Sequence, residues 1–110
     1  MPLDGTTYAP LKVYSALTAA RSRIERGWCG HGPRDRDGVC AIIALSDAAR
    51  EYGYDVYVEA SLILLAAVKE TGSARGGVTE FNDSHIQQEV LAVYDRAIEL
   101  AMYEPALLAA

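Results

Sequence analysis

The chain has 110 residues, a net charge of −5 at pH 7 and a hydrophobic content of 51%. This length suits a single domain that can bury a core without a metal ion or a disulfide. The negative charge argues against nucleic-acid or anionic-membrane partners, and no apolar run reaches the roughly 18 residues of a membrane span.

The first 26 residues predict an N-terminal arm over residues 1–9 and a helix over 10–26. Pro10 suits the first turn of a helix, and Gly27 suits its end. Apolar residues recur at three- and four-residue spacing and predict one buried stripe. That stripe consists of Leu11, Tyr14, Leu17, Ala20 (or Arg21) and Ile24.

Residues 27–38 predict a glycine-rich loop, and a helix follows over 39–51 with Asp35 or Asp37 as its cap. The buried candidates of this helix are Cys40, Ile43, Ala44, Leu45 and Ala48. Residues 54–70 predict a third helix that begins near Asp55 and ends at Gly72. Residues 54–59 also alternate as a strand would, but the continuation is too long and too rich in Ala and Leu for a strand.

Residues 71–83 predict a second glycine-rich loop, and the last helix is expected over 85–103. Ser84 and Gln87 fit a capping box at its start, and Pro105 prevents its continuation. Its predicted inner face consists of Ile86, Val90, Tyr94 (or Val93), Ala97, Ile98 and Ala101. Residues 104–110 form an apolar tail that docks on the body or on a second subunit, or frays.

The predicted fold class is therefore all-α: a compact bundle of four amphipathic helices with two Gly-rich loops, in one domain over residues 10–103. No secretory signal is visible at the N-terminus, so we expect a cytoplasmic protein with reduced thiols.

Four residues have the side chains of a zinc site, namely Cys29, His31, Cys40 and His85. Their spacing lacks the paired cysteines of a zinc knuckle, so we predict no metal and no cofactor. A cysteine with one of these histidines and Asp83 would form a nucleophilic set, but no flanking signature supports a catalytic role. A Cys29–Cys40 disulfide is compatible with the spacing in an oxidising compartment, whereas a buried free Cys40 needs no such setting.

The first 36 residues hold six of the ten basic residues against three acids, which indicates a basic patch on an acidic chain. The patch is compatible with an acidic partner or a phosphate ligand, and also with a solvated face with local ion pairs. A ligand pocket between loops 27–38 and 71–84 would be lined by Trp28, His31, Arg34, Arg75, Asn82 and Asp83. The alternative is that Trp28 covers the core while Asn82 and Asp83 cap the last helix.

Several short patterns, Ile-Glu-Arg-Gly-Trp-Cys-Gly (24–30), Cys-Ala-x-x-Ala-Leu (40–45), Phe-Asn-Asp (81–83) and Glu-Val-Leu-Ala-Val-Tyr-Asp-Arg-Ala-Ile (89–98), resemble a family of short uncharacterised actinobacterial and phage proteins. The resemblance spans about residues 11–101, and Phe81 stands where Trp is usual in that family. It implies a bacterial or phage origin and an intracellular location, and it supplies no activity. It also implies that Trp28, Cys40, Asn82 and Asp83 meet in space.

From these features we expect a non-enzymatic module that binds a partner protein or self-associates, with no nucleic acid and no membrane among its partners. The alternative is a small-ligand binding protein, including one for phosphate-containing ligands, that uses the pocket between the two loops.

Overall fold

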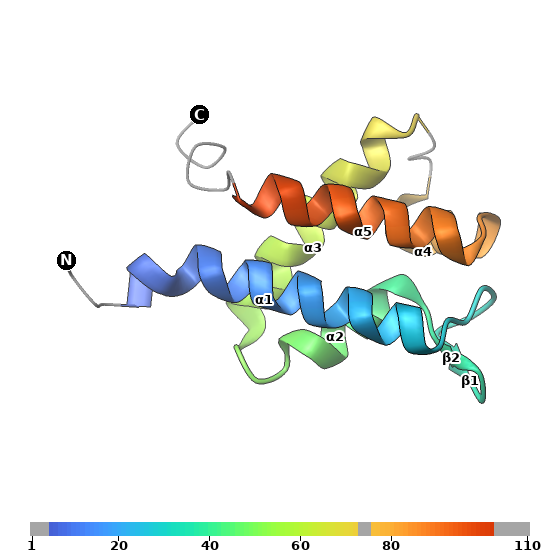
Figure 1. Cartoon of the computed structure of the whole chain (residues 1–110), viewed down its shortest axis with the longest axis horizontal. Coiled ribbons are helices and arrows are strands. Elements are labelled where there is room, and N and C mark those ends of the chain that lie inside the picture. Colours follow the sequence, from blue (N-terminus) through green and yellow to red (C-terminus); the bar gives the residue numbers. More distant parts are fainter. Residues whose placement is uncertain (1–4, 73–75, 103–110) are drawn as a thin grey trace.

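Five helices and one short hairpin make up the part of the chain that the computed structural model describes, residues 5–72 and 76–102 (Figure 1). The helices are α1 (Gly5–Arg26), α2 (Ala41–Ala49), α3 (Tyr54–Glu70), α4 (Gly77–Ser84) and α5 (Gln87–Met102). The strands β1 (Arg34–Asp35) and β2 (Gly38–Val39) pair antiparallel between α1 and α2. The helical class is confirmed, but the expected number of four helices is one too few.

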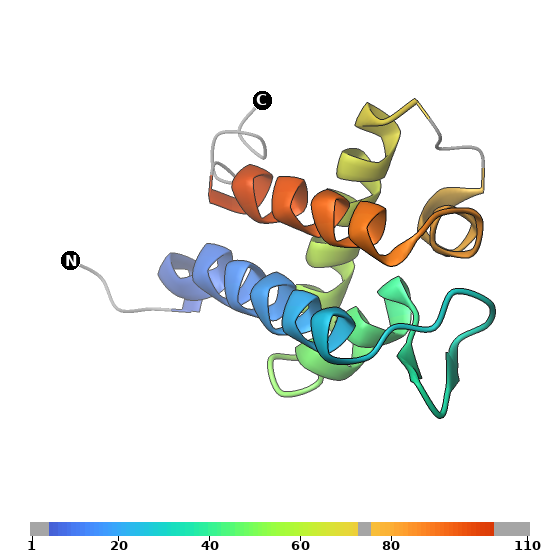
Figure 2. The ribbon, with the colours of Figure 1, turned by 45° about the vertical axis from the view of Figure 1, so that its right-hand side comes forward.

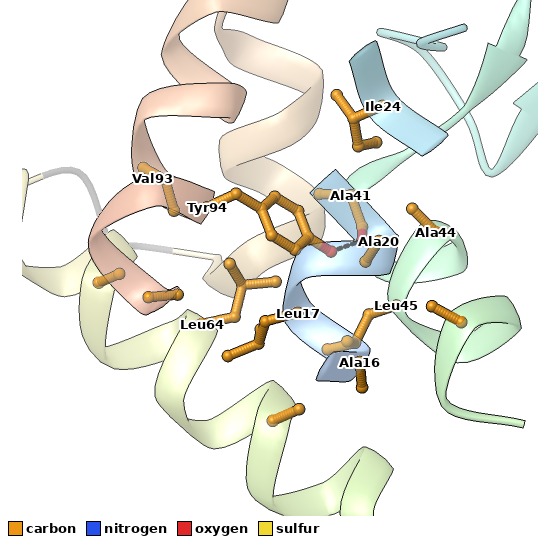
Figure 3. Packing of buried hydrophobic residues seen from close by; sticks show 14 of the residues in the cluster. Ala16, Leu17, Ala20, Ile24, Ala41, Ala44, Leu45, Leu64, Val93 and Tyr94 are labelled. Carbon is orange, nitrogen blue, oxygen red and sulfur yellow. Dashed lines mark hydrogen bonds between the residues drawn. The ribbon is translucent and has the colours of Figure 1, made fainter. Parts of the chain in front are cut away.

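Helices α1 and α5 lie side by side and run in opposite directions, with α3 crossing both and α2 beside α1 (Figures 1 and 2). Two contacts fix this pair. Arg21 forms an ion pair with Asp95, and the Gln87 side chain donates to the Ile24 carbonyl at 2.8 Å. The core between the helices is mainly aliphatic, and Figure 3 shows the ring of Tyr94 pointing into it.

The buried stripe of α1 differs from the expected one. Its buried residues are Val13, Ala16, Leu17, Ala20 and Ile24. Leu11 is 58% exposed and Tyr14 is 38% exposed, so both were wrongly assigned to the core. The helix packs against α2, α3 and α5, and its alanines allow the neighbouring backbones to approach closely.

The start of α1 also differs from the expectation, because the helix begins at Gly5 and not at Pro10. Proline has no N–H to donate to the Thr6 carbonyl, so the first turns lack one hydrogen bond. By contrast, α3 has the expected bounds. It lies between Gly53, with φ of +105°, and Gly72, with φ of +80°. Both glycines adopt backbone conformations that other residues rarely accept.

The second glycine-rich segment is not a continuous loop, because it contains α4. Ser84 ends α4, where its hydroxyl donates to the Glu80 carbonyl at 2.8 Å, so the predicted capping box is wrong. The start of α5 is capped instead by Glu89, whose Oε1 accepts from the Ile86 N–H at 3.1 Å. The apolar tail over residues 104–110 lies outside the described residues.

Candidate functional site

Asn82 of α4 is fully buried where α4, α2 and the first loop meet. Its Oδ1 accepts hydrogen bonds from the Trp28 indole N–H at 2.8 Å and from the Ala41 N–H at 2.9 Å. Its Nδ2 donates to the Cys29 carbonyl at 2.9 Å and to Asp83 Oδ1 at 3.2 Å. Both donors and the carbonyl oxygen of this amide are therefore engaged within the protein.

The first loop closes over Asn82 through close backbone contacts. A Cβ atom on Gly38 would lie 1.9 Å from the Gly27 carbonyl carbon, and one on Gly30 would lie 2.5 Å from the Trp28 ring. Val39 N–H donates to the Gly27 carbonyl at 3.1 Å. The structure thus brings the first loop and the Asn82 region together, as the resemblance implied. They are joined by hydrogen bonds of Asn82 to Trp28 and Cys29.

The caps predicted for α2 and for the last helix are both wrong, because the side chains concerned bind other backbone groups. Asp35 Oδ1 accepts from the backbone N–H groups of Asp37 at 2.8 Å and of Gly38 at 3.1 Å. These hydrogen bonds lower the pKa of Asp35 and tighten the turn of the hairpin. The first N–H of α2 is satisfied instead by Asn82, which therefore caps α2 and not the last helix.

Cys29 and Cys40 are buried free thiols, 1% and 2% exposed, and form no disulfide in this structure. The backbone of His31 lowers the pKa of Cys29, but burial and the Asp35 carboxylate raise it by more, so the net shift is upward. A raised thiol pKa disfavours the nucleophilic thiolate. Within residues 5–72 and 76–102, no three His, Cys, Asp or Glu side chains gather closely enough to hold a metal ion.

Among the described residues, His31 and Arg34 have different partners. The His31 side chain is 88% exposed, with Nε2 4.0 Å from Asp35. Arg34 pairs with Asp47 at 3.2 Å, and Arg75 lies outside the described residues. Whether any of them binds a ligand stays a prediction.

A shallow basic hollow of about 300 Å³ lies where the end of α1 meets the hairpin. Its lining residues are Arg23, Arg26, Gly27, Arg34, Gly38, Val39 and Asp47. Three arginines and one aspartate line it, so the hollow carries the local positive charge that the sequence indicated.

A larger groove of about 440 Å³ lies between the end of α3, α4 and the first half of α5. Its charged residues Glu70, Glu89 and Arg96 are functional candidates that no sequence motif singled out. Phe81 and His85 also line it, and their rings stack with centroids 3.8 Å apart. The four-residue spacing of these two rings was the available sequence signal, since such residues share one face of a helical turn.

Comparison with known proteins gives one match. The sequence model of a family of unknown function, DUF6197, matches residues 9–100. No curated protein and no solved structure matches the chain. None of the helices in the described ranges is long and apolar enough to cross a membrane. The bacterial or phage origin and the cytoplasmic location stay predictions.

Proposed function

Since the chain belongs to the family of unknown function DUF6197, which supplies no activity, we propose a function from its own surface: it is a non-enzymatic module that self-associates through α1. The observation that carries this proposal is the exposed side of α1 from Leu11 to Ala19. This side presents Leu11, Tyr14, Ser15, Thr18 and Ala19 to solvent, with Lys12 as its only charged residue.

This face, which we call the α1 face, has a single charged residue, whereas the chain as a whole has a net charge of −5. Two acidic molecules repel each other, and the repulsion is smallest where the approaching surfaces carry few charges. A face that meets its own copy through a two-fold axis is the commonest arrangement of soluble homo-oligomers. The charge distribution therefore favours a second copy of this chain as the occupant of the α1 face.

The end of α5 adds a further exposed apolar side chain at the same end of the molecule. Because α1 and α5 are antiparallel, α5 ends where α1 begins, on the left of Figure 1. Met102, in the last turn of α5, is 64% exposed. Leu11 and Tyr14 supply the apolar contacts that dimer interfaces concentrate at their centre, and Met102 lies at the same end of the molecule.

Sedimentation equilibrium of the protein and of the double variant Leu11→Glu/Tyr14→Glu tests the proposal. We expect the wild type to form dimers and the double variant to be monomeric, since four carboxylates would face each other across the two-fold axis. Leu62→Glu is the matched control. Leu62 is 61% exposed on α3 between the buried Ala60 and Leu64, so it faces away from the core and from α1, and this variant should remain dimeric.

A wild type that is monomeric up to about 1 mM, where association would contribute only about 4 kcal/mol, overturns self-association. Capture of a different protein by the α1 face of such a monomer would also contradict a homodimer and indicate a heterologous partner. If Leu62→Glu dissociates the dimer as completely as the double variant does, the interface does not lie on the α1 face.

The basic hollow favours a second candidate function, the binding of a small phosphate-containing anion. Arg23 and Arg26 are exposed and point from the last turns of α1, and Arg34 reaches the hollow from the hairpin. Guanidinium groups recognise phosphate oxygens through paired hydrogen bonds.

Titration with inorganic pyrophosphate, followed by amide chemical shifts, tests this second function. Shifts confined to the hollow and lost in Arg23→Ala/Arg26→Ala, but kept in Lys12→Ala, would support it. Shifts that persist in the double variant would contradict it.

A further inference from the structure

The groove between α3, α4 and α5 combines a small-molecule volume with an apolar floor. Its volume of about 440 Å³ lies within the range of ligand pockets, roughly 300–1,000 Å³. Ala67, Ala92 and Val93 provide part of the floor, and the Phe81 ring provides more of it. The alanines leave the space open that longer side chains would fill.

His85 is held in one orientation at this groove. Its Nδ1 lies 2.8 Å from the Phe81 carbonyl oxygen, which can only accept, and 3.0 Å from the Ser84 hydroxyl, which donates to the Glu80 carbonyl. The tautomer with the proton on Nδ1 satisfies both contacts. The ring also stacks on Phe81 with an interplanar angle of 14°. In the neutral imidazole, Nε2 is then an acceptor, and no described residue donates a hydrogen bond to it.

The charged side chains of the groove carry a net negative charge. Arg96 donates to Glu70 at 2.6 and 3.1 Å, and it also pairs with Glu99 at 3.5 Å. Arg96 lowers the pKa of Glu70 by hydrogen bonding, so this pair stays ionised at neutral pH. Glu89 uses Oε1 to cap Ile86, and its Oε2 has no hydrogen-bond partner among the described residues.

The lining therefore holds two carboxylates against one guanidinium, and no described residue donates a hydrogen bond to Glu89 Oε2 or to His85 Nε2. Both atoms accept hydrogen bonds, and together with the excess of carboxylates they favour a ligand with donors and a positive charge over an anion. We propose that this groove binds a small primary ammonium compound with a compact apolar or aromatic body. The ammonium group lies between Glu89 and His85, and the body packs on Phe81 and the alanines.

Titration with benzylamine, with benzyl alcohol and benzoate as neutral and anionic analogues of the same size, tests the proposal. Calorimetry and amide chemical shifts of the full chain are the measurements. We expect benzylamine to bind in the groove, benzyl alcohol to bind at least about tenfold more weakly and benzoate not to bind. Equal binding of the three compounds overturns the proposal, and so does absence of benzylamine binding.

Two variants locate the site. Glu89→Gln keeps the oxygen that caps Ile86 but removes the charge, so it should weaken benzylamine binding about tenfold. Glu51→Gln is the matched control, because it removes the same charge from an exposed position outside the groove. Ala92→Leu fills the groove from an exposed position without changing the charge and should abolish binding. Unchanged binding in both groove variants overturns the assignment.

A primary ammonium group can belong to a free amine or to a lysine side chain of another protein. Nα-acetyl-lysine methylamide, which keeps the side-chain ammonium group, is titrated in parallel and distinguishes the two sources. Tighter binding of benzylamine would indicate a free amine, and tighter binding of the lysine derivative would indicate a protein ligand. Either result supports binding in the groove only if Glu89→Gln weakens the binding of the same compound.

Discussion

At the scale of single residues, Asn82 links three segments that are far apart in the sequence. It joins α4 to the Trp28 indole, to the first N–H of α2 and to the backbone of Cys29. A buried amide with all its partners in place fixes one arrangement of the segments around it. In this structure both donors of the Asn82 amide and its oxygen are engaged within the protein.

Replacement of Asn82 by alanine should destabilise the protein by about 3 kcal/mol. The substitution leaves the Trp28 and Ala41 donors and the Cys29 carbonyl without their partner in a buried place, and each such group costs about 1–3 kcal/mol. Urea denaturation gives the free energy of unfolding. Trp28 is the only tryptophan, so its emission reports this contact alone and should move to longer wavelength.

Asp83→Ala is the matched control for this prediction. Asp83 is exposed and shares only one hydrogen bond with Asn82, so its removal should change the free energy of unfolding by less than about 0.5 kcal/mol. Equal losses in the two variants would show that the network around Asn82 does not stabilise the fold.

The two cysteines should behave as protected thiols. Both are almost completely buried, so a thiol reagent reaches them only when the protein opens locally or globally. We expect two thiols per chain to react with Ellman's reagent at once in denaturant and slowly in buffer. Rapid reaction of the native protein would contradict their burial, and fewer than two reactive thiols in denaturant would indicate a disulfide.

At the scale of elements, the contact between α1 and the hairpin depends on two glycines that face each other. Gly38 has no room for a Cβ, since that atom would lie 1.9 Å from the Gly27 carbonyl group. Gly38→Ala must therefore push the hairpin away from the end of α1, and it should lower the free energy of unfolding by roughly 2–3 kcal/mol.

Thermal or urea unfolding of Gly38→Ala, compared with Arg36→Ala, measures this effect. Arg36 lies in the exposed turn of the same hairpin, so its truncation should leave the stability nearly unchanged. A stable Gly38→Ala protein would show that the hairpin can separate from α1 at little cost.

Elements with strong periodicity were predictable and those set by tertiary contacts were not. The bounds of α3 follow from a long Ala- and Leu-rich run between two glycines. Helix α4 was missed because its eight residues include the turn-forming Asn82, Asp83 and Ser84, which favour loops by themselves. Burial of Phe81 and Asn82 against α2 and α3 outweighs that local preference.

The candidate sites also contain some features that the local sequence predicts and others that only tertiary contacts determine. The sequence pointed to Trp28 and Asn82 as neighbours, but the cap predicted for Asn82 was on the last helix, whereas Asn82 caps α2. Leu11 and Tyr14 fitted a helical stripe as well as Val13 and Ala16 do. Which of two overlapping stripes becomes buried depends on the helices packed against α1, and periodicity alone does not contain that information.

At the scale of the whole molecule, stability at alkaline pH depends on one buried phenol. Tyr94 is fully buried, and its hydroxyl donates to the Ala41 carbonyl at 2.6 Å (Figure 3). Burial raises the pKa of Tyr94 well above its usual value, and the nearby Cys40 and Tyr57 raise it further. Because the folded pKa is the higher one, the folded state keeps the proton that the unfolded chain releases above about pH 10.

This linkage predicts how the stability difference between the wild type and Tyr94→Phe changes with pH. At pH 7 the wild type should be more stable by about 1 kcal/mol, the contribution of one hydrogen bond. Above about pH 10 this advantage should shrink by about 1.4 kcal/mol for each pH unit and reverse near pH 11, because phenylalanine has no proton to lose. Urea denaturation followed by circular dichroism at several pH values measures the difference, and Tyr54→Phe, altered at a 76% exposed ring, should show no such trend. A constant difference between the wild type and Tyr94→Phe from pH 7 to 11 would mean that Tyr94 ionises in the folded protein, which its burial among α1, α2 and α5 should prevent.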